Sequence, residues 1–272
     1  MHTFGTISLR SSLCVPPITL LVLALCSSLN VQGQTWPPAV SLPEAPQPQD
    51  SVTLRATPLN LLKDQGAIWS SPVRIRDNDF RYLIPLGLLV TVAITTDHQA
   101  MSEVVSKDSS FNNTNTNASN VLLGAFVAAP VALYGAGRLR SDDHARETGI
   151  LGGEAMVDSL VVDEAMKYIF LRERPTMDGA RGKFFQTSVG SNSSFPSTHS
   201  MIAWSSAAVL ADEYPSRLNE LGIYALATGV SLTRVLSQQH FPSDVLVGSA
   251  LGWMVGHYVY RKHHRWSGGF DR

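Results

Sequence analysis

Apolar segments of helical length follow one another through most of the chain, and they constrain its fold more than any other feature. No run between them alternates apolar and polar residues between turn pairs, which is the pattern of a half-buried strand. The sequence therefore predicts an all-α fold, a helical bundle of about six core helices. The segments are Arg81 to Thr95, Val121 to Leu139, Arg146 to Arg172, Ser200 to Asp212, Leu218 to Leu236 and Val245 to Tyr260.

The lengths of these segments bear on whether the bundle spans a membrane. Runs without Asp, Glu, Lys or Arg are 15 residues (Tyr82 to Thr96), 13 residues (Leu221 to Thr233) and 16 residues (Val245 to Tyr260). A clear transmembrane helix has roughly 18 or more such residues. Val121 to Gly137 is the best candidate for a spanning segment. We expect a globular or peripherally attached bundle, and the alternative is an integral inner-membrane protein whose site faces the periplasm.

The amino-terminal segment has the layout of an export signal. A polar lead with one arginine precedes the apolar stretch Ile18 to Leu25, and small and polar residues follow. We expect Met1 to Gly33 to be a signal peptide and the protein to reach the periplasm or cell envelope; a buried or membrane-anchoring helix is the alternative. Cys14 and Cys26 both lie in this segment, so the mature chain would have no thiol for a disulfide.

Two polar stretches mark the organisation of the remaining chain. Gln34 to Gln49 contains five prolines and is expected to be a linker, within an amino-terminal extension over residues 34–78. Ser106 to Asn120 contains five asparagines and has no apolar period, so we expect an exposed loop. The helical domain is placed at residues 79–265, followed by a tail at 266–272.

A net charge of -1 with 16% charged residues argues against nucleic acid as a partner.

The first chemical pattern contains two cations followed by a proline. Lys167 and Arg174 are seven residues apart, which places them on one face of a helix, two turns apart. Pro175 then discourages continuation of the helix. Two converging cations suit a phosphate group. The alternative is surface charge at a helix end, because Arg172 and Glu173 are neighbours.

The second pattern, Ser197-Thr198-His199, lies directly before an apolar helical run. Ser197 is placed as the N-cap, and the backbone N–H groups that follow it form an anion site with the helix dipole. His199 in the first turn would project toward the same anion. A plain helix cap with an exposed histidine is the alternative.

The third pattern combines Arg234, His240 and Asp244. Pro242 is expected to open the last helix, with Asp244 in its first turn. A carboxylate that accepts from one imidazole nitrogen fixes the tautomer and leaves the other nitrogen as an unprotonated nucleophile. Arg234 matches a phosphate with two parallel hydrogen bonds. A surface loop is the alternative.

Together the three patterns resemble the signature of the type 2 phosphatidic acid phosphatase (PAP2) superfamily, K-x6-RP, PSGH and SR-x5-H-x3-D. An ordered chance match to all three is on the order of 1 in 10⁵ for a chain of this length. The resemblance covers roughly Glu147 to Arg261. Thr198 stands where the family usually has glycine, and Thr233 where it usually has serine. The first departure matters more, because glycine lets the backbone approach a phosphate closely.

The resemblance implies a helical phosphoric ester hydrolase of the acid phosphatase or phosphatidate phosphatase type. His240, oriented by Asp244, would attack phosphorus to form a phosphohistidine, and His199 would protonate the leaving oxygen. No metal or other cofactor is implied, and the adjacent His263 and His264 are expected to belong to a solvated, basic helix end. The implied phosphate-binding residues are Lys167, Arg174, Ser197, Thr198 and Arg234.

Two alternatives to this function come from other classes. Vanadium haloperoxidases use a very similar cage with vanadate in place of phosphate, and a degenerate structural or binding membrane protein would keep the helices without the chemistry.

The partner of the site is expected to be a phosphate ester. The substrate is open between water-soluble phosphomonoesters and lipids such as phosphatidate or undecaprenyl diphosphate, the latter with membrane association.

Overall fold

The computed structural model describes residues 52–265, and within this range the chain is helical without a β-strand. The prediction of an all-α fold is confirmed. The predicted signal peptide, the proline-rich linker with the extension up to residue 51, and the tail at 266–272 lie outside the described residues. The α-helices are α2 (Thr57–Ser70), α3 (Phe80–Gln99), α4 (Ser109–Arg140), α5 (Asp143–Phe170), α6 (Thr198–Glu213), α7 (Arg217–Leu236) and α8 (Pro242–His263). Short helical turns are η1 (Ser71–Arg74), η2 (Asp77–Asp79), η3 (Ala100–Val104), η4 (Asp178–Ala180) and η5 (Gly190–Asn192).

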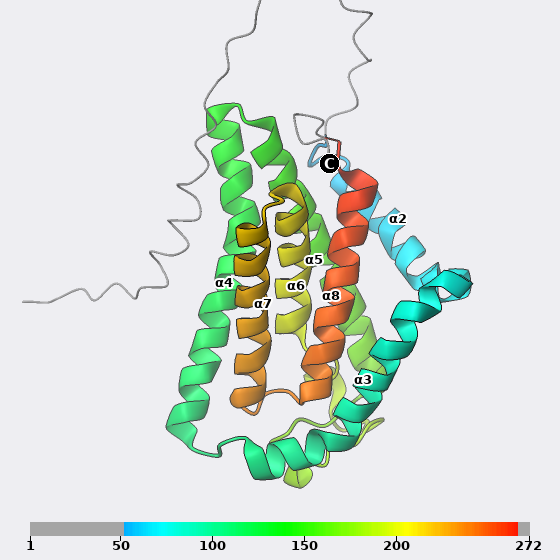
Figure 1. Cartoon of the computed structure of the whole chain (residues 1–272), viewed down its shortest axis with the longest axis vertical. Helices are drawn as coiled ribbons and strands as arrows, with labels where there is room; N and C mark the ends of the chain where they lie inside the picture. Colours follow the sequence, from blue (N-terminus) through cyan, green and yellow to red (C-terminus); the bar gives the residue numbers. More distant parts are fainter. Residues whose placement is uncertain (1–51, 266–272) are drawn as a thin grey trace, which may run out of the picture. The chain divides into compact units, whose positions relative to one another are not determined.

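Helix α6 lies at the centre of the bundle and packs against α4, α5, α7 and α8 (Figure 1). Its buried residues are mostly small, with Ala203 and Ala207 in one core cluster beside Phe126 of α4 and Val230 of α7. Helix α3 packs on α8 and α2 packs on α5, both outside this core. The six predicted helical segments correspond to α3 to α8, except that α5 ends at Phe170, before Arg172. Lys167 lies on α5 and Arg174 lies in the connection that follows, so the prediction that both share one helix face is wrong.

Three glycines on α8 set how closely it approaches α6. Gly248, Gly252 and Gly256 recur every four residues, so they share one face of the helix. A Cβ built on Gly248 would lie only 2.7 Å from the carbonyl oxygen of Ser197. Residues without a side chain allow two helix backbones to come into direct contact. The first turn of α8 is thereby held beside the start of α6, where the Ser197 N–H donates to the Asp244 carbonyl at 3.1 Å.

Gly252→Ala is expected to lower the midpoint of thermal unfolding, because the added Cβ would collide with the carbonyl oxygen of Met201 on α6. Overpacking costs about 1–3 kcal/mol, which corresponds to a fall of several degrees, roughly 2–4 °C per kcal/mol at this size. Gly153→Ala on α5 is the matched control, since a Cβ there meets nothing within 4 Å and alanine favours the helix. Equal midpoints for the two variants in a thermal melt would contradict the close α6–α8 contact.

The asparagine-rich stretch is helical from Ser109 onward, so the predicted exposed loop is wrong for most of its length. The Asp108 side chain accepts from the Phe111 N–H at 2.7 Å and caps the new helix α4. Within the first turns, short polar side chains donate back to carbonyls four residues earlier, as Thr116 does to Asn112 at 3.0 Å. Polar composition alone therefore misled the prediction, because capping and local hydrogen bonds support this helix.

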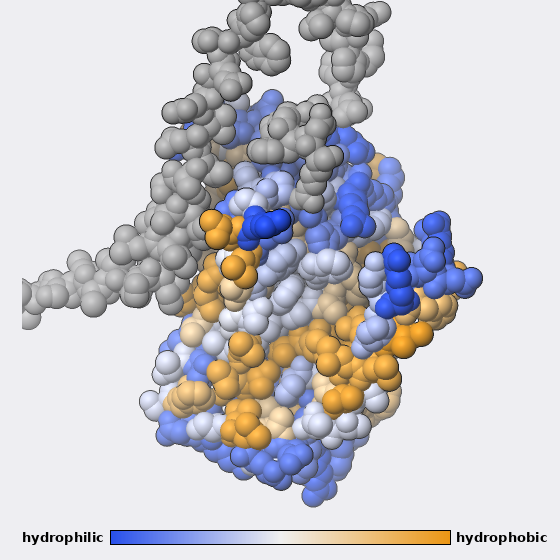
Figure 2. Space-filling view, viewed as in Figure 1, coloured by the Kyte–Doolittle hydropathy of each residue, from blue (hydrophilic) through white to orange (hydrophobic). Residues whose placement is uncertain are grey.

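Two helical stretches are long and apolar enough to cross a membrane, residues 77–104 and 109–140. None of the residues in the most apolar part of the first is buried, and Tyr82, Leu88 and Val92 are each more than half exposed. Figure 2 shows hydrophobic residues gathered in a broad patch on one face, with hydrophilic residues along its lower border. The charge-free run Tyr82 to Thr96 looked too short to span, but the helical structure continues through η3 to Val104.

Candidate functional site

All three sequence patterns come together at the end of the bundle where α7 connects to α8, at the bottom of Figure 1. Burial lowers the pKa of His199 to about 3, together with electrostatic interactions with four predicted site residues: Arg234, His240, Lys167 and Arg174. Arg174 and Arg234 lower the pKa of His240, and Asp244 raises it. Each group comes from a different turn or connection, so the convergence is a product of the tertiary fold.

His240 lies in the connection between α7 and α8, and its side chain is buried. Its Nδ1 is 2.7 Å from the carbonyl oxygen of Ser194. A carbonyl can only accept, so Nδ1 carries the hydrogen and Nε2 is the unprotonated nitrogen. Burial lowers the pKa of His240 to about 4, against the opposing effect of Asp244. The imidazole is therefore neutral at pH 7.

Asp244 does not hold His240 in the way that the spacing suggested. Its Oδ2 is 3.7 Å from Nδ1 of the imidazole, farther than the Ser194 carbonyl. The same Oδ2 accepts from the Phe241 N–H at 2.8 Å and from the Ser194 hydroxyl. Asp244 thus holds the Phe241 backbone and the Ser194 side chain beside the ring, and the sequence did not reveal the contribution of Ser194.

Arg172 is the largest fully buried side chain in the described part of the chain, although its position in the sequence suggested surface charge. Its guanidinium lies between the rings of Phe184 and Phe241, 4.6 and 4.2 Å from their centroids. It donates to Asp244 Oδ1 at 2.5 Å and to Asp97 Oδ2 at 2.7 Å. A buried ion network thus joins α3, the α5–α6 connection and the start of α8.

Arg174 and Arg234 provide the donors expected of a phosphate cradle. Arg174 is anchored by the Asn192 side chain at 2.9 Å and by the Gln239 carbonyl at 3.1 Å. Arg234 is buried and donates through Nη1 to Ser119 at 3.3 Å, but its Nε is buried without a hydrogen-bond partner in residues 52–265. A buried donor without an acceptor costs about 1–3 kcal/mol. A bound anion would provide that acceptor.

Thr198, which replaces the family glycine, links two charged side chains of α5. Its Oγ1 accepts from Lys167 Nζ at 2.5 Å and donates to Asp163 Oδ2 at 2.8 Å. Lys167 also pairs directly with Asp163 at 2.9 Å. Thr198 is the first residue of α6 and is not among the residues with positive φ, so its β-branched side chain fits the local backbone.

Ser197 occupies the N-cap position of α6, as predicted, with an extended backbone. Its hydroxyl does not cap the helix; it accepts from Ser200 Oγ at 3.2 Å. Helix α4 adds two residues that the sequence did not indicate. Asn120 Oδ1 is 3.0 Å from His199 Nε2, and the buried Ser119 contacts Arg234. The polar stretch before Val121 thus lies against the site.

Comparison with known proteins agrees with the predicted resemblance. The model of the PAP2 superfamily matches residues 148–267. A lipid A 1-phosphatase of Porphyromonas gingivalis is 33% identical over 110 residues, which cover 40% of this chain but only 22% of that protein. The crystal structure of a transmembrane PAP2-type phosphatidylglycerolphosphate phosphatase from Bacillus subtilis superimposes with a TM-score of 0.47 at 20% identity, covering 78% of this chain and 96% of the other. The chain carries a PAP2 superfamily domain, which spans residues 148–267.

Proposed function

We propose that the protein is a phosphatase that hydrolyses lipid phosphate esters at a membrane surface through a phosphohistidine on His240. The observation that carries this proposal is the buried cradle around a neutral imidazole. Arg174 and Arg234 act on this imidazole, Lys167 acts with them on the neighbouring His199, and a donor of Arg234 has no protein acceptor within the described residues. This combination fits a dianionic phosphate.

The first step forms a bond between Nε2 of His240 and phosphorus. The bond from phosphorus to the ester oxygen breaks, and its electron pair stays on that oxygen, which takes a proton from His199. In the second step a water molecule attacks phosphorus, the phosphorus–nitrogen bond breaks, and His199 accepts the proton of the water. Inorganic phosphate leaves and both histidines return to their initial states.

The cations act on the phosphoryl group as its charge spreads over the three equatorial oxygens. Burial, and after it the nearby cations, lower the pKa of His199 to about 3 when the site holds no anion. A dianionic substrate offsets those charges. The bound substrate thereby raises the pKa of His199, which favours its role as the acid.

Exposed apolar side chains beside the cradle favour a lipid as the substrate. Tyr168 and Ile169 are 60% and 53% exposed and directly follow Lys167. Phe185 is 67% exposed, and its backbone N–H donates to the Phe170 carbonyl at the end of the same helix at 2.8 Å. Large apolar patches on a protein surface mark contacts with lipid or a partner. The two apolar helices α3 and α4 and the name of the lipid A phosphatase relative support the same substrate class.

The function is tested by extraction and assay of the full chain. We expect the protein to remain in the membrane fraction after an alkaline carbonate wash and to need detergent for release. In mixed micelles, kcat/KM for a long-chain lipid phosphate should exceed that for its water-soluble short-chain analogue by about 10-fold or more. Release without detergent together with a preference for soluble monoesters would reject the lipid assignment. Bromide oxidation with vanadate and peroxide, without phosphatase activity, would favour a haloperoxidase.

Thr198→Val is expected to lower kcat/KM by about 10-fold, because it removes a hydroxyl that Lys167 donates to at 2.5 Å. A hydrogen bond to a charged group contributes about 1.5–3 kcal/mol. Thr198→Ser is the matched control, since it keeps the hydroxyl and should retain most activity. If steady-state kinetics give both variants the same loss, Thr198 does not position Lys167.

A further inference from the structure

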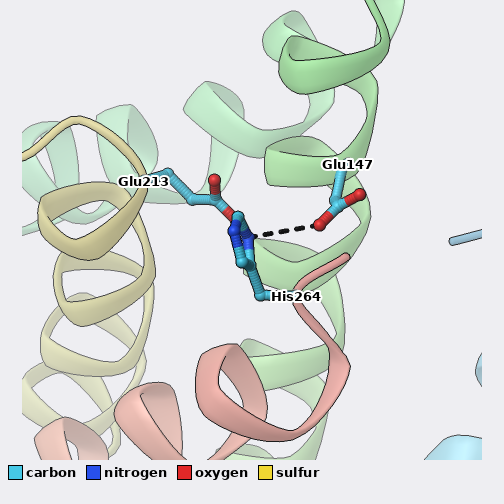
Figure 3. A group of neighbouring side chains, drawn as sticks. All are labelled: Glu147, Glu213 and His264. Atoms are coloured by element: carbon cyan, nitrogen blue, oxygen red, sulfur yellow. Dashed lines mark hydrogen bonds and ion pairs between the residues drawn. The ribbon is translucent and has the colours of Figure 1, made fainter. Parts of the chain in front are cut away.

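A second cluster of charged side chains lies at the opposite end of the bundle from the candidate site. It joins the start of α5, the end of α6 and the residue that follows α8, through Glu147, Glu213 and His264 (Figure 3). Glu147 is twenty residues before Lys167 on α5, about 30 Å along the helix. Both glutamates are buried. The basic helix end that the sequence suggested is therefore wrong for His264, which turns inward onto the two carboxylates.

The donor atoms are spaced as ligands of one metal ion. One atom from each residue lies within 4.8 Å of the others. His264 Nδ1 is 3.0 Å from Glu213 Oε1 and 3.2 Å from Glu147 Oε1. Ligand atoms at the 2.0–2.2 Å bond lengths of Zn²⁺ are roughly 3.0–3.5 Å apart in tetrahedral or octahedral geometry. His264 Nδ1 carries at most one hydrogen, which cannot point at both Glu213 Oε1 and Glu147 Oε1. A metal ion bound to Nδ1 could contact both oxygens.

The surrounding groups hold these ligands in place. His144 Nε2 contacts the second oxygen of Glu213 at 2.9 Å, and the backbone N–H of Arg265 donates to Glu147 Oε1 at 2.6 Å. Outer partners of this kind orient the carboxylates and histidines that bind metals. Two buried carboxylates with one imidazole suit a divalent transition metal better than Mg²⁺, which prefers oxygen ligands alone.

We propose that Glu147, Glu213 and His264 bind a divalent transition-metal ion of the Zn²⁺ class. Water would complete the coordination. The ion would fasten the carboxyl end of α8 to α5 and α6. This site is independent of the proposed phosphatase function, because it uses none of the residues of the phosphate cradle.

The test uses the full chain without a polyhistidine tag, treated with EDTA and purified in detergent. Isothermal titration with ZnCl₂ should give one Zn²⁺ per chain, with no binding of MgCl₂ at the same concentration, and Zn²⁺ should raise the thermal midpoint. His264→Ala should weaken Zn²⁺ binding at least about 10-fold. His257→Ala is the matched control, since His257 of α8 pairs with Asp212 of α6 outside the cluster, and this variant should bind Zn²⁺ as the wild type does.

X-ray absorption at the zinc edge provides a test that does not depend on a variant. The wild-type protein should show one imidazole and several oxygen ligands. Absence of Zn²⁺ binding, a spectrum without imidazole, or undiminished affinity in both His264→Ala and Glu213→Gln would overturn the proposal. The cluster would then be only an ion-pair network.

Discussion

His240→Ala is expected to lower kcat by at least about 10³-fold, because it removes the atom that receives the phosphoryl group. Its stability should change little by comparison, since the contacts of Asp244 with the Ser194 hydroxyl and the Phe241 N–H do not involve the ring and remain in the variant. Hydrolysis of a lipid phosphate in mixed micelles measures the effect. His257→Ala, a histidine variant distant from the site, should keep wild-type turnover.

Trapping the phosphoenzyme intermediate distinguishes the role of His240 from that of His199. Wild-type protein mixed with ³²P-labelled substrate and quenched in alkali should carry a label that is lost in acid, which is the behaviour of a phosphohistidine. His240→Ala should carry none. With p-nitrophenyl phosphate, whose leaving group needs no proton, His199→Ala should still form the phosphoenzyme and accumulate it, because water activation is slow. Labelling of His240→Ala at the wild-type level would falsify the nucleophile assignment.

The sequence predicted the helices whose apolar residues form the core and missed those held by polar contacts. Segments such as Ser200 to Asp212 fill the interior, so hydrophobic periodicity revealed them. Helix α2 escaped prediction because its single buried residue is Asp64, and because it docks on α5 through hydrogen bonds such as that of Gln65 to Asp158 at 2.8 Å. The start of α4 was not predicted for the same reason, because polar hydrogen bonds rather than apolar burial support it.

The motifs identified the candidate site residues, but the tertiary fold brings them together, since Arg174 and His240 lie in the connections that follow α5 and α7. The residues that support them come from distant segments. Asp97 meets Arg172 across 75 positions and Asn120 meets His199 across 79. The sequence did contain one indication that Asp97 is paired. Asp97 follows a charge-free apolar run, and a single acid that becomes buried at the end of such a run needs a partner. The sequence did not reveal that Arg172 is this partner, because it stands beside Glu173 in a charged motif.

Arg172→Met is expected to destabilise the protein by about 3–5 kcal/mol, because it leaves Asp97 and Asp244 buried without their common cation. At roughly 2–4 °C per kcal/mol, the thermal midpoint in detergent should fall by about 10 °C. Arg181→Met is the matched control from the same connection between α5 and α6. Its side chain is 63% exposed and 3.9 Å from Asp178, so the midpoint should not change measurably.

A second substitution tests whether the loss comes from the charges. Asp97→Asn removes one of the two carboxylates and keeps the pair of Arg172 with Asp244, so it should cost less than Arg172→Met. Because both residues belong to one network, the double variant should be less destabilised than the sum of the single effects. Additive losses, or equal midpoints for Arg172→Met and Arg181→Met, would show that α3 is not joined to the site through this network. With coupled losses, α3 is joined through Arg172 to Asp244, whose carboxylate accepts from the Ser194 hydroxyl and the Phe241 N–H that flank His240.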